Sequence, residues 1–199
     1  MSKSLLRGAL LVAASIAPSV AFAHPGHEAE AGLALGFMHP LGGLDHLLAM
    51  VAVGLLAFQL GGRSLWLTPV AFVSFMVLGG SLGAAGVGLP LVEVMIALSV
   101  VTLGALVALR VRWNAALAAT IVAAFALFHG QAHGAEMPAQ GSAAAYVAGF
   151  VMATVLLHGI GIFLGYLVSR ISQNRSAWIA SGSGAATACA GFAMLLTHI

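Results

Sequence analysis

The sequence predicts an all-α integral membrane protein with six transmembrane helices after a cleavable N-terminal signal peptide. Of its 199 residues, 61% are hydrophobic and only 6% are charged, and the mean hydropathy is +1.09. Apolar stretches recur at about the 20 residues that a spanning helix needs. They lack the alternation of barrel strands, and hydrocarbon admits only helices and closed barrels as spanning structures. Residues 24–199 are therefore expected to form one transmembrane domain.

The first 23 residues have the pattern of a secretory signal peptide. Lys3 and Arg7 precede an apolar run from Leu10 to Ile16, and Ala21-Phe22-Ala23 forms a small-x-small cleavage site. The alternative is an uncleaved first helix, which this run favours less because it is shorter than a span. Cleavage after Ala23 would make His24 the first mature residue.

The spans follow in order, separated by short linkers rich in Gly, Pro, Ser and Asn. The first span is closed by residues 61–64, the second turns into the third at 86–90, and residues 171–176 separate the fifth from the sixth. Small residues gather at 79–83 and 181–184, where we expect helix backbones to approach closely. The expected spans are 35–60, 65–88, 89–109, 114–135, 143–168 and 177–197.

The basic residues predict the orientation. After signal removal five remain, and all fall in the first, third and fifth loops: Arg63, Arg110, Arg112, Arg170 and Arg175. Basic residues are enriched in cytoplasmic loops, so these three loops are expected to face the cytoplasm. Both mature termini are then expected in the periplasm, with the protein in the bacterial inner membrane. Adding or removing one span would place basic loops on both sides, which supports the count of six.

Charge and cysteine content exclude other classes of protein. The formal charge is only +2, and the seven Lys and Arg are scattered, so nucleic acid is not an expected partner. Cys189 is the one cysteine and can form no internal disulfide. The expected surroundings are the lipid bilayer. The sequence leaves the oligomeric state open, a homo-oligomer included.

One block of ionisable residues lies near the end of the fourth span. Such groups are rare in hydrocarbon, where an Asp costs roughly 2.5 to 3.5 kcal/mol on insertion scales, so they usually serve a function. His129, His133 and Glu136 stand at i, i+4 and i+7 and project from one helix face. Two imidazoles and a carboxylate on one face form a partial coordination shell for a divalent metal ion.

A second block lies at the start of the first span. His39 and His46 are seven residues apart, and Asp45 lies one residue off their line. The Gly42-Gly43 pair near Pro40 predicts a helix that is loosened there or begins late. We expect all three ionisable residues to join the metal site.

The predicted orientation places both blocks at the outer side of the membrane. Further residues extend a metal path inward: Glu93 about one turn into the third span, Met50 one turn beyond His46, and His158 near the middle of the fifth span. His158 is equally well explained as a hydrogen-bonded packing residue, and Met50 is favoured as packing. The mature N-terminus could capture metal through His24, His27 and Glu28, or these residues could form a disordered tail.

Ligand type narrows the ion. Imidazole with carboxylate suits Ni²⁺, Co²⁺, Zn²⁺ or Cu²⁺, and the lack of a thiolate pair argues against a Cu(I) or iron-sulfur site. The residues alone do not choose among these ions.

At these residues the chain resembles the HupE/UreJ family of bacterial nickel permeases. That family is marked by His-x5-Asp-His in the first mature span, here His39 to Asp45-His46, and by Phe-His-Gly-x-Ala-His-Gly-x-Glu in the fourth, here residues 128–136. The resemblance covers the whole chain. It implies nickel uptake from the periplasm for a nickel enzyme such as hydrogenase or urease, and leaves cobalt open as the cargo.

The expected function is thus a permease that works by facilitated diffusion or secondary transport, with no permanently bound cofactor. No Gly-x4-Gly-Lys-Ser/Thr phosphate loop is present, so ATP hydrolysis is not encoded. The main alternative is an intramembrane metalloenzyme with Glu136 or Asp45 as base, although the His-Glu-x-x-His signature is absent. A haem-binding electron carrier and a sensor or accessory subunit are weaker alternatives.

Overall fold

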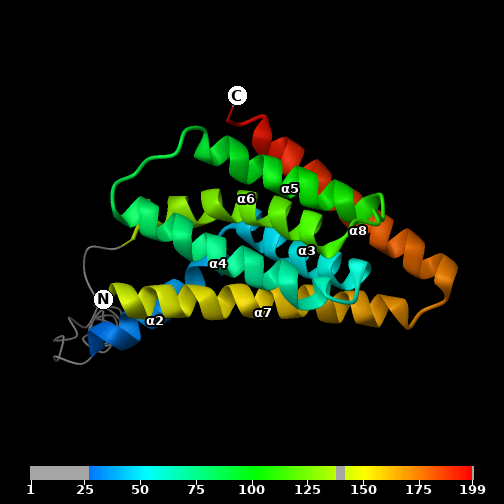
Figure 1. Cartoon of the computed structure of the whole chain (residues 1–199), viewed down its shortest axis with the longest axis horizontal. Coiled ribbons are helices and arrows are strands. Elements are labelled where there is room, and N and C mark those ends of the chain that lie inside the picture. Colours follow the sequence, from blue (N-terminus) through cyan, green and yellow to red (C-terminus); the bar gives the residue numbers. More distant parts are fainter. Residues whose placement is uncertain (1–26, 138–141, 199) are drawn as a thin grey trace, which may run out of the picture.

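The structure is a computed structural model that describes residues 27–137 and 142–198. The predicted signal peptide at 1–23 and His24 lie outside the described residues, and the side chains of His27 and Glu28 are not described. Within these ranges all regular structure is helical, as predicted (Figure 1). The helices are α2 (His27–Gly42), α3 (Leu44–Leu60), α4 (Ser64–Ala84), α5 (Val92–Ala108), α6 (Ala115–Ala135), α7 (Ala143–Ser169) and α8 (Gln173–Leu195).

The first predicted span is a bent pair of helices rather than one helix from residue 35. The axes of α2 and α3 differ by 83° at the break. Gly43 there has extended backbone angles (φ −98°, ψ 120°), and Pro40 lacks the N–H that a continuous helix would use. The predicted loosening at Gly42-Gly43 is therefore a sharp break, and α2 begins at His27, before the predicted start.

The helices support a multi-pass membrane protein. In the described part of the chain, α4, α6, α7 and most of α8 are long and apolar enough to cross a bilayer, and the α2–α3 pair could form a fifth span. α5 has 17 residues and is apolar but shorter. Large apolar side chains such as Trp178 and Phe163 are exposed, as on a lipid-facing surface. The count of six spans stays a prediction.

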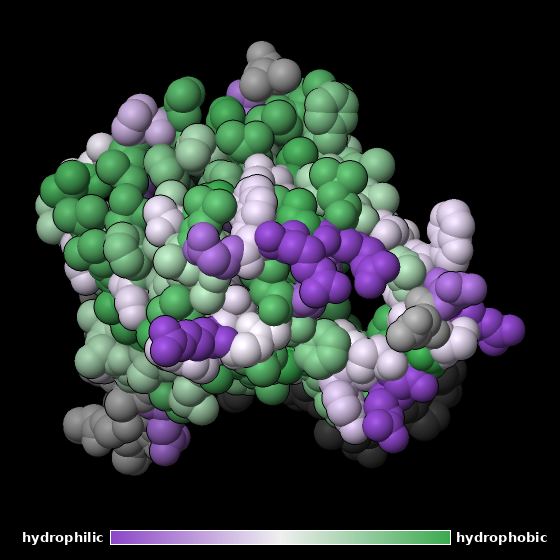
Figure 2. Space-filling model, turned by 45° about the vertical axis from the view of Figure 1, so that its right-hand side comes forward, coloured by the Kyte–Doolittle hydropathy of each residue, from purple (hydrophilic) through white to green (hydrophobic). Residues whose placement is uncertain are grey.

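The arginines of the described residues gather at one end of the bundle, which we call the arginine end: Arg63, Arg110, Arg112, Arg170 and Arg175. The connections that carry the first four, and the first turn of α8 that carries Arg175, lie on the right in Figure 1. Turned forward in Figure 2, this end shows hydrophilic patches on a surface that is otherwise mostly apolar. The connection from α4 to α5 and the start of α7 lie at the opposite end, together with the end of α6.

The central helix α3 packs against each of the other described helices, and its Met50 is fully buried in the apolar core. Glycines let the surrounding helices pack closely. A Cβ atom on Gly79 or Gly83 of α4, or on Gly130 or Gly134 of α6, would overlap the backbone of the other helix. Gly184 of α8 packs in the same way against α5, whereas Gly182 meets nothing within 4 Å. Both predicted seams are thus confirmed, apart from Gly182.

The close contact between α4 and α6 predicts an effect on stability. Gly79→Val is expected to lower the thermal midpoint of the purified protein by at least several degrees or to prevent folding, because the new side chain overlaps the Leu127 carbonyl of α6. Gly182→Val is the matched control, since it changes an exposed helical glycine. Equal midpoints for both variants would contradict the close α4–α6 contact.

Candidate metal site

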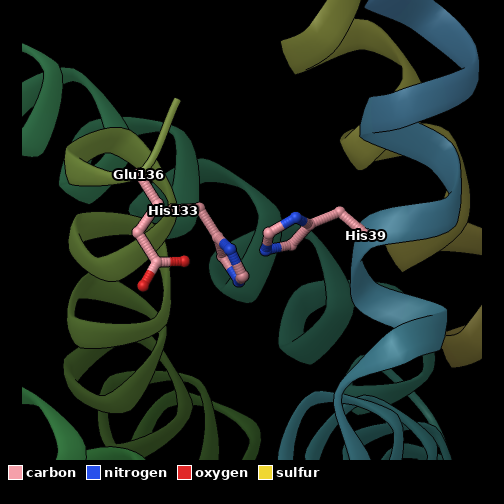
Figure 3. A group of neighbouring side chains, drawn as sticks. All are labelled: His39, His133 and Glu136. Atoms are coloured by element: carbon pink, nitrogen blue, oxygen red, sulfur yellow. The ribbon is translucent and has the colours of Figure 1, made fainter. Parts of the chain in front are cut away.

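Residues from the two sequence blocks converge at the end of the bundle opposite the arginine end. Candidate ligand atoms of His39, His133 and Glu136 all lie within 4.8 Å of one another. Figure 3 shows the two imidazoles pointing toward each other, one from α2 and one from α6, with the carboxylate beside His133. Since a metal ion holds such ligands at about 2.0 to 2.2 Å, small side-chain movements would close this group around one ion.

The bend after α2 makes this convergence possible, because it lets α2 pack along α7 while α3 enters the core. Gly36 of α2 lies against the Tyr146 backbone, and Gly149 of α7 lies against the Leu33 backbone. A Cβ atom at either glycine would overlap the other helix. This close packing holds His39, in the last turn of α2, beside the end of α6.

Two more histidines adjoin this group. The ring of His46 lies 4.3 Å from that of His133 and 4.7 Å from that of His129, between centroids. His46, His129 and His133 are 7%, 0% and 6% exposed. The structure therefore brings together all four histidines of the two predicted blocks, with His129 the most deeply buried.

Asp45 is placed to orient His46. Its Oδ1 accepts the His46 backbone N–H at 2.8 Å and lies 2.7 Å from His46 Nδ1. An ionised carboxylate in this place fixes the proton on Nδ1, so Nε2 keeps its lone pair. Among the described residues Nε2 has no hydrogen-bond partner, although it is buried. This is the arrangement by which a carboxylate prepares a histidine to bind a metal.

Ser99 of α5 does the same for His129. Its hydroxyl oxygen lies 2.6 Å from the Ile96 carbonyl, to which it donates, and 2.8 Å from His129 Nε2. The hydroxyl oxygen therefore accepts a hydrogen bond from the Nε2–H group, which leaves the lone pair on Nδ1. That buried atom also lacks a partner within the described residues. The sequence analysis did not identify Ser99, because the register of α5 against α6 is not visible in spacing along one chain.

His133 lacks a partner at both ring nitrogens in the described part of the protein. Its ring packs 4.2 Å from that of Phe150. The nearby Tyr146 hydroxyl is also buried and unpartnered among the described residues. A buried polar group without a partner costs about 1 to 3 kcal/mol. The free lone pairs of these imidazoles are suitable ligands for a borderline divalent ion.

The site opens at the protein surface through a pocket of about 520 Å³. Carboxylates from three helical segments line it, and Glu93 near the start of α5 is exposed there. Their negative charge favours entry of cations. The ionisable residues of its wall are His39, Asp45, His46, Glu93, His133 and Glu136.

The remaining predicted residues lie elsewhere. Met50 is packed in the apolar core. His158 lies deeper in the bundle, where its ring packs against that of Phe72. His27 and Glu28 begin α2.

Loss of the Ser99 hydroxyl should weaken metal binding. We expect the nickel dissociation constant of Ser99→Ala to be about tenfold larger, because His129 would lose its fixed tautomer. This is the lower end of the roughly 10- to 100-fold range for residues that orient a metal ligand. Equilibrium dialysis of the purified protein measures this constant. Ser183→Ala, which removes an exposed hydroxyl that bonds within α8, is the control. An unchanged constant in Ser99→Ala would contradict the role of this hydroxyl in preparing His129 to bind the metal.

The family model described as HupE / UreJ protein matches residues 11–194. The chain belongs to the HupE/UreJ family. It is similar to Protein HupE of Rhizobium leguminosarum bv. viciae, with 49% identity over 185 residues, which covers 93% of this chain and 95% of that protein. No solved structure matches the chain.

Membership of HupE/UreJ supports transition-metal transport as the general function and places the chain among permease-type proteins rather than enzymes. It also agrees with the multi-pass helical architecture. The candidate metal site joins residues from both sequence blocks that carry the resemblance.

Proposed function

We propose that the protein is a nickel permease that imports Ni²⁺ from the periplasm into the cytoplasm for maturation of a nickel enzyme, hydrogenase or urease. The observation that carries this proposal is the convergence of His39, His133 and Glu136 in one open pocket. Family membership supports the transport of a transition metal. Imidazole and carboxylate together suit nickel, and cobalt is the alternative cargo because it accepts the same ligands.

The shape of the site favours transport over catalysis. A metalloenzyme would hold one ion in a closed site with an open coordination position. Here the pocket is wide and open, and lone pairs continue inward from His133 to His46 and His129. Each exchange of one imidazole for the next needs only a short step of the ion.

The positions of charge support the direction. Carboxylates surround the pocket at one end of the bundle, and the arginines lie at the other. Basic residues favour the cytoplasmic side, so the pocket would open to the periplasm. Transport proceeds by facilitated diffusion or coupling to an ion gradient. Protons compete with the metal because the ligands bind it only when deprotonated, so uptake falls as the external pH falls.

Uptake of radioactive nickel by cells that express the protein tests the proposal. We expect uptake well above that of cells with an empty vector, and inhibition by excess cobalt, which accepts the same ligands. His198→Ala is the matched control, because this histidine is exposed near the C-terminus. Cobalt uptake without nickel uptake would favour the cobalt permease. No uptake of either metal by correctly inserted protein would contradict the proposal.

A further inference from the structure

A buried histidine lies beyond the site described above. His158 of α7 is 2% exposed, and neither ring nitrogen has a hydrogen-bond partner among the described residues. A histidine that only packs in a core usually donates to a carbonyl or hydroxyl, because an unpaired buried polar group costs about 1 to 3 kcal/mol. The cost at His158 therefore needs a functional explanation.

The neighbouring face of α4 carries a second buried polar group in the same condition. Thr68, Phe72 and Met76 follow one another at intervals of four residues, so they share one face of α4. The Thr68 hydroxyl is fully buried and has no partner within the described ranges. A buried threonine in a helix can donate to a carbonyl of the preceding turn, as Thr154 does to Phe150 at 2.9 Å.

Contacts between α4 and α7 place these two groups at a similar depth. Thr154 lies 3.6 Å from the Met76 sulfur, and the His158 ring lies 5.1 Å from the Phe72 ring. The two helices are antiparallel, so Thr68 follows Phe72 one turn nearer the arginine end. His158 and Thr68 thus lie on facing helices, at or just inward of Phe72.

A line of rings joins this place to the outer histidines. Centroid distances are 4.3 Å from His133 to His46, 4.7 Å from His46 to His129, 5.7 Å from His129 to Phe72, and 5.1 Å from Phe72 to His158. Phe72 is the one apolar ring in this line and separates His158 from the outer group. From His158, α7 continues for about 16 Å to its end at Ser169, at the arginine end, given a rise of about 1.5 Å per residue.

We propose that His158, together with the Thr68 hydroxyl, forms a second, inner binding site for the transported divalent ion. The proposal rests on the function proposed above. The ion would leave His129, pass the Phe72 ring and bind a lone pair of His158, with Thr68 and water as the remaining ligands. One imidazole and a hydroxyl bind more weakly than the outer group, and a weak site suits an ion that must leave again.

Nickel titration of the purified protein in detergent tests the site without transport. We expect wild type to bind one ion at the outer group and a second ion more weakly. His158→Leu should keep the first event, with a dissociation constant within about threefold, and lose the second. Thr68→Ala should weaken only the second event, and Thr68→Ser should restore it. His198→Leu serves as the control.

Uptake by cells provides the second readout. His158→Leu should reduce nickel uptake at least tenfold at equal protein levels. The inner site would be overturned if His158→Leu showed the same two binding events as wild type, or if its nickel uptake equalled that of wild type. If His158→Leu does not fold, an unchanged second event in Thr68→Ala overturns it instead. Failure of the permease proposal looks different, because wild-type cells would then take up no metal while the binding experiment still reports on the inner site.

Discussion

Alanine at position 133 is expected to reduce nickel uptake to the level of cells that lack the protein. His133 is the residue shared by both parts of the site: it lies within 4.8 Å of His39 and Glu136 through its ligand atom, and its ring lies 4.3 Å from that of His46. Its removal would break the outer group and also the first step inward. We expect a loss of at least about 100-fold, because removing a ligand should cost no less than the roughly 10- to 100-fold seen for residues that only orient one.

Initial rates of nickel uptake at matched protein levels measure this effect, with His198→Ala as control. The variants His39→Ala and Glu136→Ala add a sharper test. If both side chains bind the same ion as His133, each of these two single variants should also lower nickel uptake strongly. Substantial uptake by His133→Ala would remove this histidine from the path.

Asp45→Asn is expected to weaken nickel binding about 10- to 100-fold, although the amide has nearly the same size. The carboxylate accepts from the backbone and ring of His46, at 2.8 and 2.7 Å. An amide in its place carries no charge and no longer fixes the His46 proton on Nδ1. Binding should fall while the thermal midpoint changes little, because Asp45 is partly exposed.

A double-mutant cycle distinguishes positioning from direct ligation by Asp45. If Asp45 acts through His46, the variant Asp45→Ala/His46→Ala should bind nickel as weakly as His46→Ala alone. Equilibrium dialysis of the purified variants gives the constants. Independent losses that multiply in the double variant would instead make Asp45 a direct ligand of the ion.

Much of this site could be predicted from the sequence, because the informative signals are local. Helical periodicity alone places His129, His133 and Glu136 on one helix face. An ionisable group in an apolar span also stands out, because its transfer into hydrocarbon costs free energy. The pattern of arginines correctly predicted that the basic connections share one end of the bundle. The glycines of 79–83 predicted a close helix contact for the same local reason.

What the sequence did not predict depends on how helices are registered against each other. Ser99 meets His129 only because α5 and α6 pack at one particular register, and Phe72 lies between His129 and His158 for a similar reason. Spacing along one chain carries no information on such contacts. The direction of the Asp45 carboxylate, toward His46, was likewise set by the backbone break at Gly43 and not by periodicity.

The bend of the first span shows an intermediate case. Pro40 and Gly42-Gly43 predicted a weak point, but its 83° angle results from packing of α2 on α7 through Gly36 and Gly149. That packing brings His39 beside His133. In a straight first helix, His39 would lie on the extended axis of α3 and not beside His133.

Nickel uptake into liposomes that contain only this purified protein tests the central claim most directly. A nickel-sensitive dye inside the vesicles reports entry, and His133→Ala vesicles with the same protein content are the control. We predict entry in wild-type vesicles and the rate of protein-free vesicles in His133→Ala. Wild-type vesicles no more permeable to nickel than protein-free ones, under an imposed nickel gradient and with a proton gradient of either direction, would contradict a permease.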